Sequence, residues 1–315
     1  MRDIFVSIRG RMLLNVEALN MTESVGNYVK HRKVPVLVPE ENGFATYFVP
    51  AISGESIAHG FQKTLAEEAQ KKMLPVCNLC SKGVFLKSTN SKVVNEAFGS
   101  IQKTNLEEFI VKNCLVEDVG GFMYAEAENV KRTSNFFVGY MIPAKEAIEH
   151  VIVDPQLHSR YALGTSFVTD QGQMIYYVEL SSALYTFSMD LDTKYIGRLT
   201  FEYKDSGKDV FGENERLNRI DTVLEALKIF LLEQPFGAKK TRFLPIGEWD
   251  SIVIGLSDKT WTVNSPFTSK YVESTLKKKE KIDYNTEIFV GKREENNIEE
   301  AIINAVEKAK ERIKA

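Results

Sequence analysis

Hydrophobic and polar residues alternate from the start of the chain. A period of two puts Ile4, Val6 and Ile8 on one face of a strand over residues 4–16. The opposite face then carries Phe5, Ser7, Arg9 and Arg11. Such a face either stacks bases and pairs phosphates, as nucleic-acid-binding sheets do, or packs beneath an inserted hairpin.

A hairpin is predicted next. Two strand-like runs, 34–38 and 45–49, flank a polar stretch that ends in Asn42 and Gly43. Asn-Gly is a strong signal for a tight turn between paired strands. The residues leading into this hairpin are basic: His31, Arg32 and Lys33.

Apolar residues that recur every three or four positions predict three amphipathic helices. In the first, Ser53 is a suitable N-cap, and Pro75 ends the apolar stripe. The second and third cover 216–232 and 298–313, the latter with Asn297 as its N-cap. The exposed side of the first helix carries Ser56, His59 and Lys63.

Between these helices the pattern is weaker. Residues 76–132 predict an inserted helical subdomain with a helix at 106–115. The other expected elements are a strand at 136–142, an irregular stretch reaching Tyr161, a hairpin with arms at 165–169 and 174–180, and a strand at 251–256. This order predicts an α+β fold, in which a βαββαβ antiparallel sheet carries helices on one face and leaves the other open for a ligand.

The composition is that of an ordinary globular protein and excludes collagen-like, low-complexity and mainly disordered chains. Of 315 residues, 43% are apolar and 26% are charged, and the formal net charge is −3. No global positive field attracts a polyanion, so nucleic-acid binding would need local clusters of cations. No apolar run approaches the roughly 18 residues that span a bilayer. The first residues lack the pattern of a secretory signal, so we expect no membrane span and a cytoplasmic location.

A basic loop after the second helix is the most informative local signal. Residues 236–242 contain Gly237 followed by three cations, Lys239, Lys240 and Arg242. Glycine allows close backbone approach, and lysine and arginine supply charge and donors for phosphates. The alternative is a solvated loop whose cations favour a helix C-terminus. The residue order is not that of a P-loop.

A second candidate anion site is the start of the first helix. Unpaired amides near Ser53, Gly54 and Ser56, together with the positive end of the helix dipole, attract anions. His59 and Lys63 extend this face. An acidic residue in the first turn opposes anion binding, and the simpler interpretation is an N-cap followed by a polar, solvent-facing stripe.

Three cysteines are a sparse and odd set that argues against a disulfide framework. Cys77 and Cys80 have the spacing of zinc ligands, but a metal needs about four ligands and the sequence has no second such pair. Cys114 and a histidine would complete a set only through the tertiary fold. We therefore expect reduced core thiols and no cofactor, with a zinc-stabilised interaction protein as an alternative.

The sequence has no nucleophile elbow, HExxH motif or dinucleotide fingerprint. His158, with Arg160 and Asp154, would supply acid, base and phosphate clamp for a metal-independent RNA endonuclease. A histidine that is structural or contacts RNA is the simpler interpretation, so we do not expect an enzyme.

Six short segments occur in a specific order: 8–11 (IRGR), 49–56 (VPAISGES), 131–134 (KRTS), 157–161 (LHSRY), 179–185 (ELSSALY) and 237–245 (GAKKTRFLP). In this order they resemble the RAMP backbone subunits of Cascade-type CRISPR surveillance complexes, in the archaeal DevR-like branch (type I-A). The resemblance covers most of the chain. It departs from the family in one place, because only Gly237 stands where such proteins have a glycine-rich loop.

The resemblance implies a modified ferredoxin-like, RRM-like palm with inserted finger and thumb regions, and several copies side by side along one guide RNA (crRNA). Such proteins hold the guide by its backbone, splay periodic nucleotides with a thumb-like hairpin, and leave base edges free to pair with single-stranded target DNA. The implied partners are further copies in a head-to-tail filament and other Cascade subunits, including the RAMP subunit at the guide 5′ end. The resemblance implies no nuclease activity for this subunit.

On this basis we expect a discontinuous core of residues 1–75, 133–150 and 178–265 with a hairpin insertion at 21–50, a helical insertion at 76–132, a thumb at 151–177 and a C-terminal helical segment at 266–315. The expected RNA-binding residues are Arg9, Arg11, His31, Arg32, Lys33, Ser53, Gly54, Ser56, His59, Lys63, Arg132, His158, Arg160, Gly237, Lys239, Lys240 and Arg242. No residue is assigned to catalysis or to a metal.

Overall fold

The computed structural model describes residues 2–99, 105–126, 129–160 and 174–315. Its strands are β1 (Phe5–Glu17), β2 (Met21–Val25), β3 (Tyr28–His31), β4 (Lys33–Glu40), β5 (Gly43–Pro50), β6 (Phe122–Tyr124), β7 (Val130–Arg132), β8 (Phe136–Val138), β9 (Ile152–Arg160), β10 (Met174–Asp192), β11 (Ile246–Ser257) and β12 (Thr286–Lys292). Its helices are α1 (Gly54–Lys71), α2 (Ser91–Phe98), α3 (Leu106–Asn113), α4 (Leu115–Gly120), α5 (Glu213–Glu233), α6 (Tyr271–Lys279) and α7 (Ile298–Lys314).

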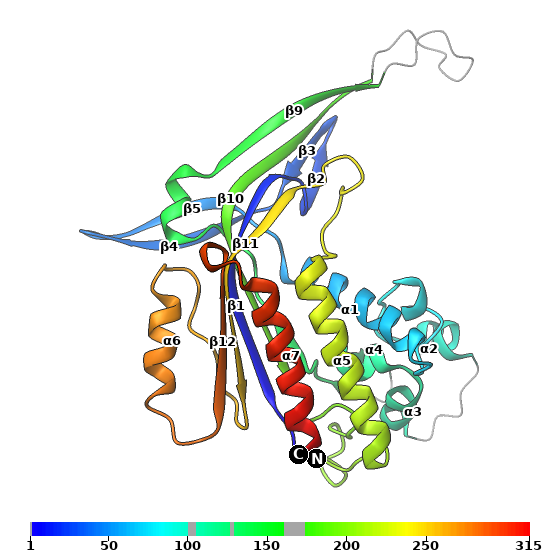
Figure 1. Cartoon of the computed structure of the whole chain (residues 1–315). Helices are drawn as coiled ribbons and strands as arrows, with labels where there is room; N and C mark the ends of the chain where they lie inside the picture. The colour runs from blue at the N-terminus through cyan, green and yellow to red at the C-terminus, as the bar shows by residue number, and fades with distance from the viewer. Residues whose placement is uncertain (1, 100–104, 127–128, 161–173) are drawn as a thin grey trace.

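One sheet forms the centre of the molecule (Figure 1). Its strands run in the order β12-β11-β1-β10-β3-β2, and β8 and β9 also pair with β10. Every pair is antiparallel except β10 with β3. β4 with β5 and β6 with β7 form two separate hairpins. The chain is an α+β protein with an antiparallel-dominated sheet.

Helices α1, α5 and α7 cover one face of the sheet and enclose the main core (Figure 1). The alternation in β1 makes this possible, since Ile8 and Met12 are fully buried on that side. They pack in one cluster with Leu224 and Leu227 of α5 and Ile302 of α7. The predicted first strand and all three predicted helices are confirmed, the helices within a few residues at each end.

The opposite face of the sheet is not open, and that expectation is wrong. The segment that follows β11, including α6, covers it with Trp261, Val263 and Tyr271, which pack on Val253. The Ser7 hydroxyl accepts from the Val263 amide at 3.0 Å. The face that carries Phe5, Ser7, Arg9 and Arg11 is therefore internal, and its cover comes from the C-terminal part of the chain and not from an inserted hairpin.

Long hairpins extend from one end of the sheet (Figure 1). β4 and β5 meet at Gly43, as Asn42 and Gly43 predict. Residues 152–160, expected to be irregular, instead form β9 and pair with the first half of β10. The predicted strand at 165–169 and its turn lie outside the described residues.

Residues 76–99 and 105–126 form the 3-10 turn Cys80–Lys82, the helices α2, α3 and α4, and strand β6. α4 packs on α1 and carries Asp118, which is fully buried. The Arg132 guanidinium forms an ion pair with Asp118 and donates to Glu107 Oε1 at 3.0 Å. This buried network joins α3 and α4 to β7. Among the described residues, no helix combines the length and apolar composition needed to cross a membrane.

Candidate nucleic-acid interface

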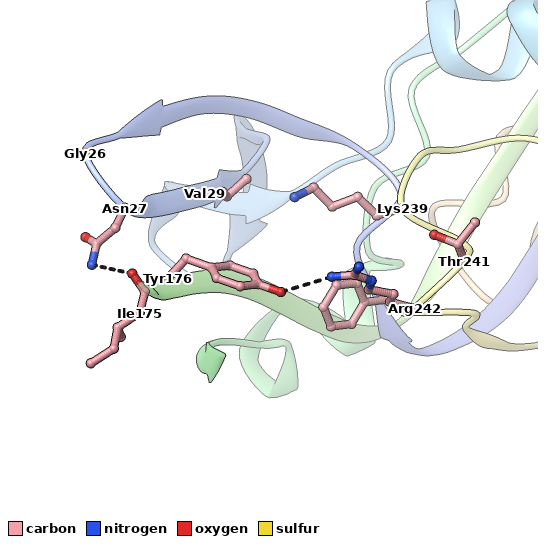
Figure 2. Close-up of a pocket in the computed structure, with 9 residues that line it drawn as sticks. Gly26, Asn27, Val29, Ile175, Tyr176, Lys239, Thr241 and Arg242 are labelled. Atoms are coloured by element: carbon pink, nitrogen blue, oxygen red, sulfur yellow. Dashed lines mark hydrogen bonds between the residues drawn. The ribbon is translucent and has the colours of Figure 1, made fainter. Parts of the chain in front are cut away.

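A groove of about 560 Å³ lies where the β2–β3 hairpin, the start of β10 and the basic loop meet. We define the groove by its lining residues: Gly26, Asn27, Val29, Ile175, Tyr176, Lys239, Thr241, Arg242 and Phe243. Figure 2 shows Lys239 and Arg242 reaching from the loop toward the strands on the other side. Three segments that are distant in sequence thus build one concave surface.

The basic loop is held rigidly at its first residues. Gly237 has a φ of +90°, and an added Cβ would lie 2.6 Å from the Leu19 side chain. A larger residue is excluded both by conformation and by space. The next amide, that of Ala238, donates to the Leu19 carbonyl at 2.9 Å. The glycine in this loop therefore docks the loop against the end of β1.

The three cations of the loop have different surroundings. Lys240 turns back, donates to the Gln234 carbonyl at 2.8 Å at the end of α5, and lies over the Phe236 ring. Burial lowers the pKa of Lys240. Lys239 and Arg242 are exposed and form no ion pair with any described residue. These two remain available to an anion in the groove.

Aromatic rings line the groove beside these cations. The Arg242 guanidinium donates to the Tyr176 hydroxyl at 3.4 Å. Tyr176 stacks on His158 with ring centroids 5.2 Å apart, and Phe243 meets the His158 ring edge-on at 5.1 Å. The outer part of the β9–β10 ribbon and the basic loop therefore share one aromatic cluster, which places His158 beside Arg242.

A second cluster of hydrogen bonds links the basic loop to the start of α1. Asn20 Oδ1 accepts from the Ser53 amide at 2.7 Å and from Arg32 Nε at 3.0 Å. Ser53 is the N-cap, as predicted, and its hydroxyl accepts from the Ser56 amide. Since Leu19, the neighbour of Asn20, binds the basic loop, residues 19–20 join that loop to Arg32 and to the helix start.

The comparisons with known proteins point to one family. A family described as "CRISPR-associated negative auto-regulator DevR/Csa2" matches residues 8–276. The chain belongs to the DevR/Csa2 family. A protein of Saccharolobus solfataricus named "CRISPR-associated protein Cas7/Csa2 1" is 34% identical over 88% of this chain and 84% of its own length. Another from the same organism, "CRISPR-associated aCascade subunit Cas7/Csa2 2", is 37% identical over 84% of each chain.

A solved structure supports the fold of this DevR/Csa2 chain. One chain of a "CRISPR RNA-guided surveillance complex" superposes with a TM-score of 0.54, covering 97% of this chain and 98% of its own. The two are only 11% identical in sequence. The likeness therefore concerns the fold alone.

Several predicted cations of the DevR/Csa2 chain are not in the groove. Arg11 is 4% exposed, pairs with Glu146 and donates to the Pro266 carbonyl at 2.8 Å. Arg9 forms two hydrogen bonds with Asp190, at 2.7 and 3.0 Å. Arg132 lies in the network described above, with 2% of its surface exposed. These charges are already neutralised inside the protein, so we leave the three arginines out of the interface.

His31, the last residue of β3, is buried. Its Nε2 faces Glu17 Oε1 at 2.5 Å and its Nδ1 faces the Arg32 carbonyl at 2.9 Å. Burial opposes a charge on the ring, but the hydrogen bond and attraction of Glu17 outweigh it and raise the pKa of His31. Both ring nitrogens face acceptors, which favours the imidazolium form. His31 thus fastens the β2–β3 hairpin to Glu17 at the end of β1 through a buried contact.

The remaining predicted residues are not among the described residues that line the groove. His59 is exposed on α1 but meets the Phe85 ring at 5.0 Å, which directs it toward the helical segment. Lys63 lies one turn further along the same helix, also exposed. Lys33 is half exposed and pairs with Glu179 at 3.4 Å. Gly54 begins α1, and Arg160 is the last residue of β9.

Sequence reasoning missed Asn20, Tyr176 and Phe243. Tyr176 sits in a strand-like run that was read only as one arm of a hairpin. By the alternation of strand residues, Tyr176 shares a face with Val178, which is fully buried, so the local pattern does not mark it as a binding residue. Asn20 has no local signal, because its role depends on Arg32 and Ser53, which reach it through the fold.

Proposed function

We propose that this chain is a non-catalytic backbone subunit of a CRISPR RNA-guided surveillance complex and binds guide RNA along its sugar-phosphate backbone. One observation carries the proposal: Lys239 and Arg242, with no ion pair to any described residue, line a single groove together with the Tyr176 ring. The names of the relatives, Cas7/Csa2 and aCascade subunit, support the same role.

The chemistry of the groove fits recognition without regard to base identity. Lysine and arginine bind phosphate oxygens, which every nucleotide carries. Aromatic rings stack on any base, because every base has a π-face. A guide held in this way keeps the Watson–Crick edges of its bases free to pair with a target DNA strand.

We further propose that β1, α1, β8, β10, α5 and β11 form a ferredoxin-like, RRM-like palm. The support is the order β11-β1-β10-β8 with antiparallel neighbours, which a βαββαβ unit gives. In this scheme the β9–β10 ribbon is the thumb and the β4–β5 hairpin is the finger. Residues 76–132 are then an insertion after the first helix.

The experiment for RNA binding is a double substitution, K239A/R242A, measured by fluorescence anisotropy with several unrelated RNA sequences. We expect affinity to fall by at least about tenfold for all of them. The salt dependence should become shallower by about 1.4 in the log–log slope, since two phosphate contacts to a single strand are lost. The matched control is K277A/K279A, which removes two exposed lysines from α6 on another part of the molecule.

Unchanged affinity in K239A/R242A, or an equal loss in the control, would show that the groove does not hold the RNA. The same samples, incubated with repeat RNA in EDTA, report on the endonuclease alternative. His158 Nε2 is buried without a hydrogen-bond partner among the described residues, and its ring is packed between Tyr176 and Phe243. A general base is normally oriented by a partner on its second nitrogen, so we expect intact RNA.

We also propose that copies of the chain contact one another head to tail through the β4–β5 hairpin. Leu37, Phe44 and Phe48 on its outer face are 60%, 71% and 73% exposed, which is unusual for side chains of this size. A heterologous contact gives an open filament, so light scattering should show assemblies that grow with RNA length. L37S/F48S should bind short RNA normally and fail to grow. One fixed oligomer at every RNA length would contradict the proposal.

A further inference from the structure

Three cysteines and one glutamate meet in the interior next to α1. The cluster consists of Cys77, Cys80, Cys114 and Glu117, all buried. One ligand atom from each, three sulfurs and a carboxylate oxygen, lies within 4.8 Å of all the others. The free cysteines form no disulfide. The cluster therefore gathers four groups that can each carry a negative charge into a small, dry volume.

The separations suit a tetrahedral ion. Zinc–sulfur bonds of about 2.3 Å place the sulfurs of a tetrahedral site about 3.8 Å apart. Cys77 Sγ and Glu117 Oε1 are 3.9 Å apart. Small rotations of the side chains would bring all four atoms to bonding distance of one ion. Three thiolates and a carboxylate are donors that zinc accepts.

The backbone arranges these ligands in two pairs. Cys77 and Cys80 have the C-x2-C spacing, and the Cys80 amide points at the Cys77 sulfur at 3.4 Å. Cys114 and Glu117 are three residues apart at the first turn of α4, a spacing that puts both side chains on one face. The Leu115 amide donates to the Pro75 carbonyl at 2.9 Å, which holds the two pairs together.

A buried lysine, Lys87, lies beside the cluster. Lys87 Nζ is buried and has no hydrogen-bond partner among the described residues. Burial lowers the pKa of Lys87, and the neighbouring Glu117 and the three cysteines oppose that effect. A glycine, Gly120, makes room for it, because an added Cβ there would collide with Lys87 Nζ. A zinc ion with three thiolates and a carboxylate has a formal charge of −2, and a buried ammonium offsets part of it.

We propose that Cys77, Cys80, Cys114 and Glu117 bind one structural zinc ion. The ion would fasten the segment that follows α1 to the N-terminus of α4. The adjacent residue, Asp118, faces the other way and pairs with Arg132. α4 would thus be fixed on both sides, by metal on one and by an ion pair on the other. This inference does not depend on the RNA-binding proposal.

The experiment uses the full-length chain purified without added metal or chelator. Elemental analysis should give about one zinc per chain, and C114S should retain less than a tenth of that amount. E96Q is the matched control for a carboxylate variant: Glu96 is an exposed residue on α2, and its substitution should leave the zinc content unchanged. E117Q should reduce the zinc content, whereas E117C should keep it, because a thiolate replaces the carboxylate.

A second measurement covers variants that fail to fold. Cobalt(II) added to metal-stripped wild-type protein should give the intense thiolate charge-transfer band and the visible bands of a tetrahedral site, and E117C should shift the visible bands. A metal chelator should lower the melting temperature of the wild type. Folded wild-type protein without stoichiometric zinc and without the cobalt bands would overturn the proposal, as would stoichiometric iron in place of zinc. Loss of RNA binding in K239A/R242A with zinc retained would confirm that the two sites are separate.

Discussion

The one arginine among the described lining residues of the groove, Arg242, and the arginines of the interior have opposite surroundings. Arg242 is exposed and forms no ion pair with a described residue. Arg132 and Arg219, by contrast, are 2% and 0% exposed and lie against Asp118. The difference lies in the neighbours. The Asp118 carboxylate pairs with Arg132 and Arg219, whereas no described carboxylate pairs with Arg242, which can therefore bind an external anion. A basic motif therefore identifies a binding residue only when the fold supplies no internal partner.

The largest expected effect is on Arg132. R132M leaves Asp118 and Glu107 buried without their main cation, which should lower the free energy of unfolding by about 3–5 kcal/mol. R242M, the matched control in the groove, should change it by less than about 0.5 kcal/mol. Urea denaturation of both variants measures the difference. Equal effects would contradict the division between interior and groove arginines.

A smaller effect is expected from His31, which carries a charge inside the protein. Its folded pKa is raised above the unfolded value of about 6.5, so its contribution is complete below that pH and is lost as the pH rises through the folded pKa. H31Q should cost about 1–3 kcal/mol at about pH 6, and less at higher pH. The exposed H150Q serves as the control. A cost for H31Q that does not decrease as the pH rises would show that the ring is neutral in the folded protein.

Much of the fold could be predicted because its elements carry local patterns. β1, the β4–β5 hairpin, α1, α5 and α7 follow from alternation, from Asn42 and Gly43, and from stripes of apolar residues. β9 was missed because Pro155 weakens the strand pattern in the sequence and because the strand forms only by pairing with β10. The cover on the second sheet face was missed because it lies in the irregular segment around Trp261, whose apolar residues have no period.

The candidate interface was predictable to a lesser extent. The basic loop has a local signal, and the structure places Lys239 and Arg242 in the groove. Lys240, Arg11 and Arg132 could not be separated from them in sequence, because each is neutralised or shielded by a distant residue. The cysteines illustrate the same limit: a cysteine pair in a sequence predicts cysteine or histidine as further ligands, whereas the fold completes the cluster with Glu117.

Strand β10 is part of both the protruding β9–β10 ribbon and the central sheet. Its residues 174–182 pair with β9 along one edge, and its residues from Ser181 onward pair with β1 along the other edge. The two ladders overlap beside an irregularity in β1 between Leu14 and Glu17, where Val16 adopts a φ of +57°. One continuous strand therefore connects the β9–β10 ribbon directly to the central sheet. If a bound nucleic acid displaces the ribbon, either β10 bends beside the irregularity in β1 or the displacement reaches the packed core beneath the sheet.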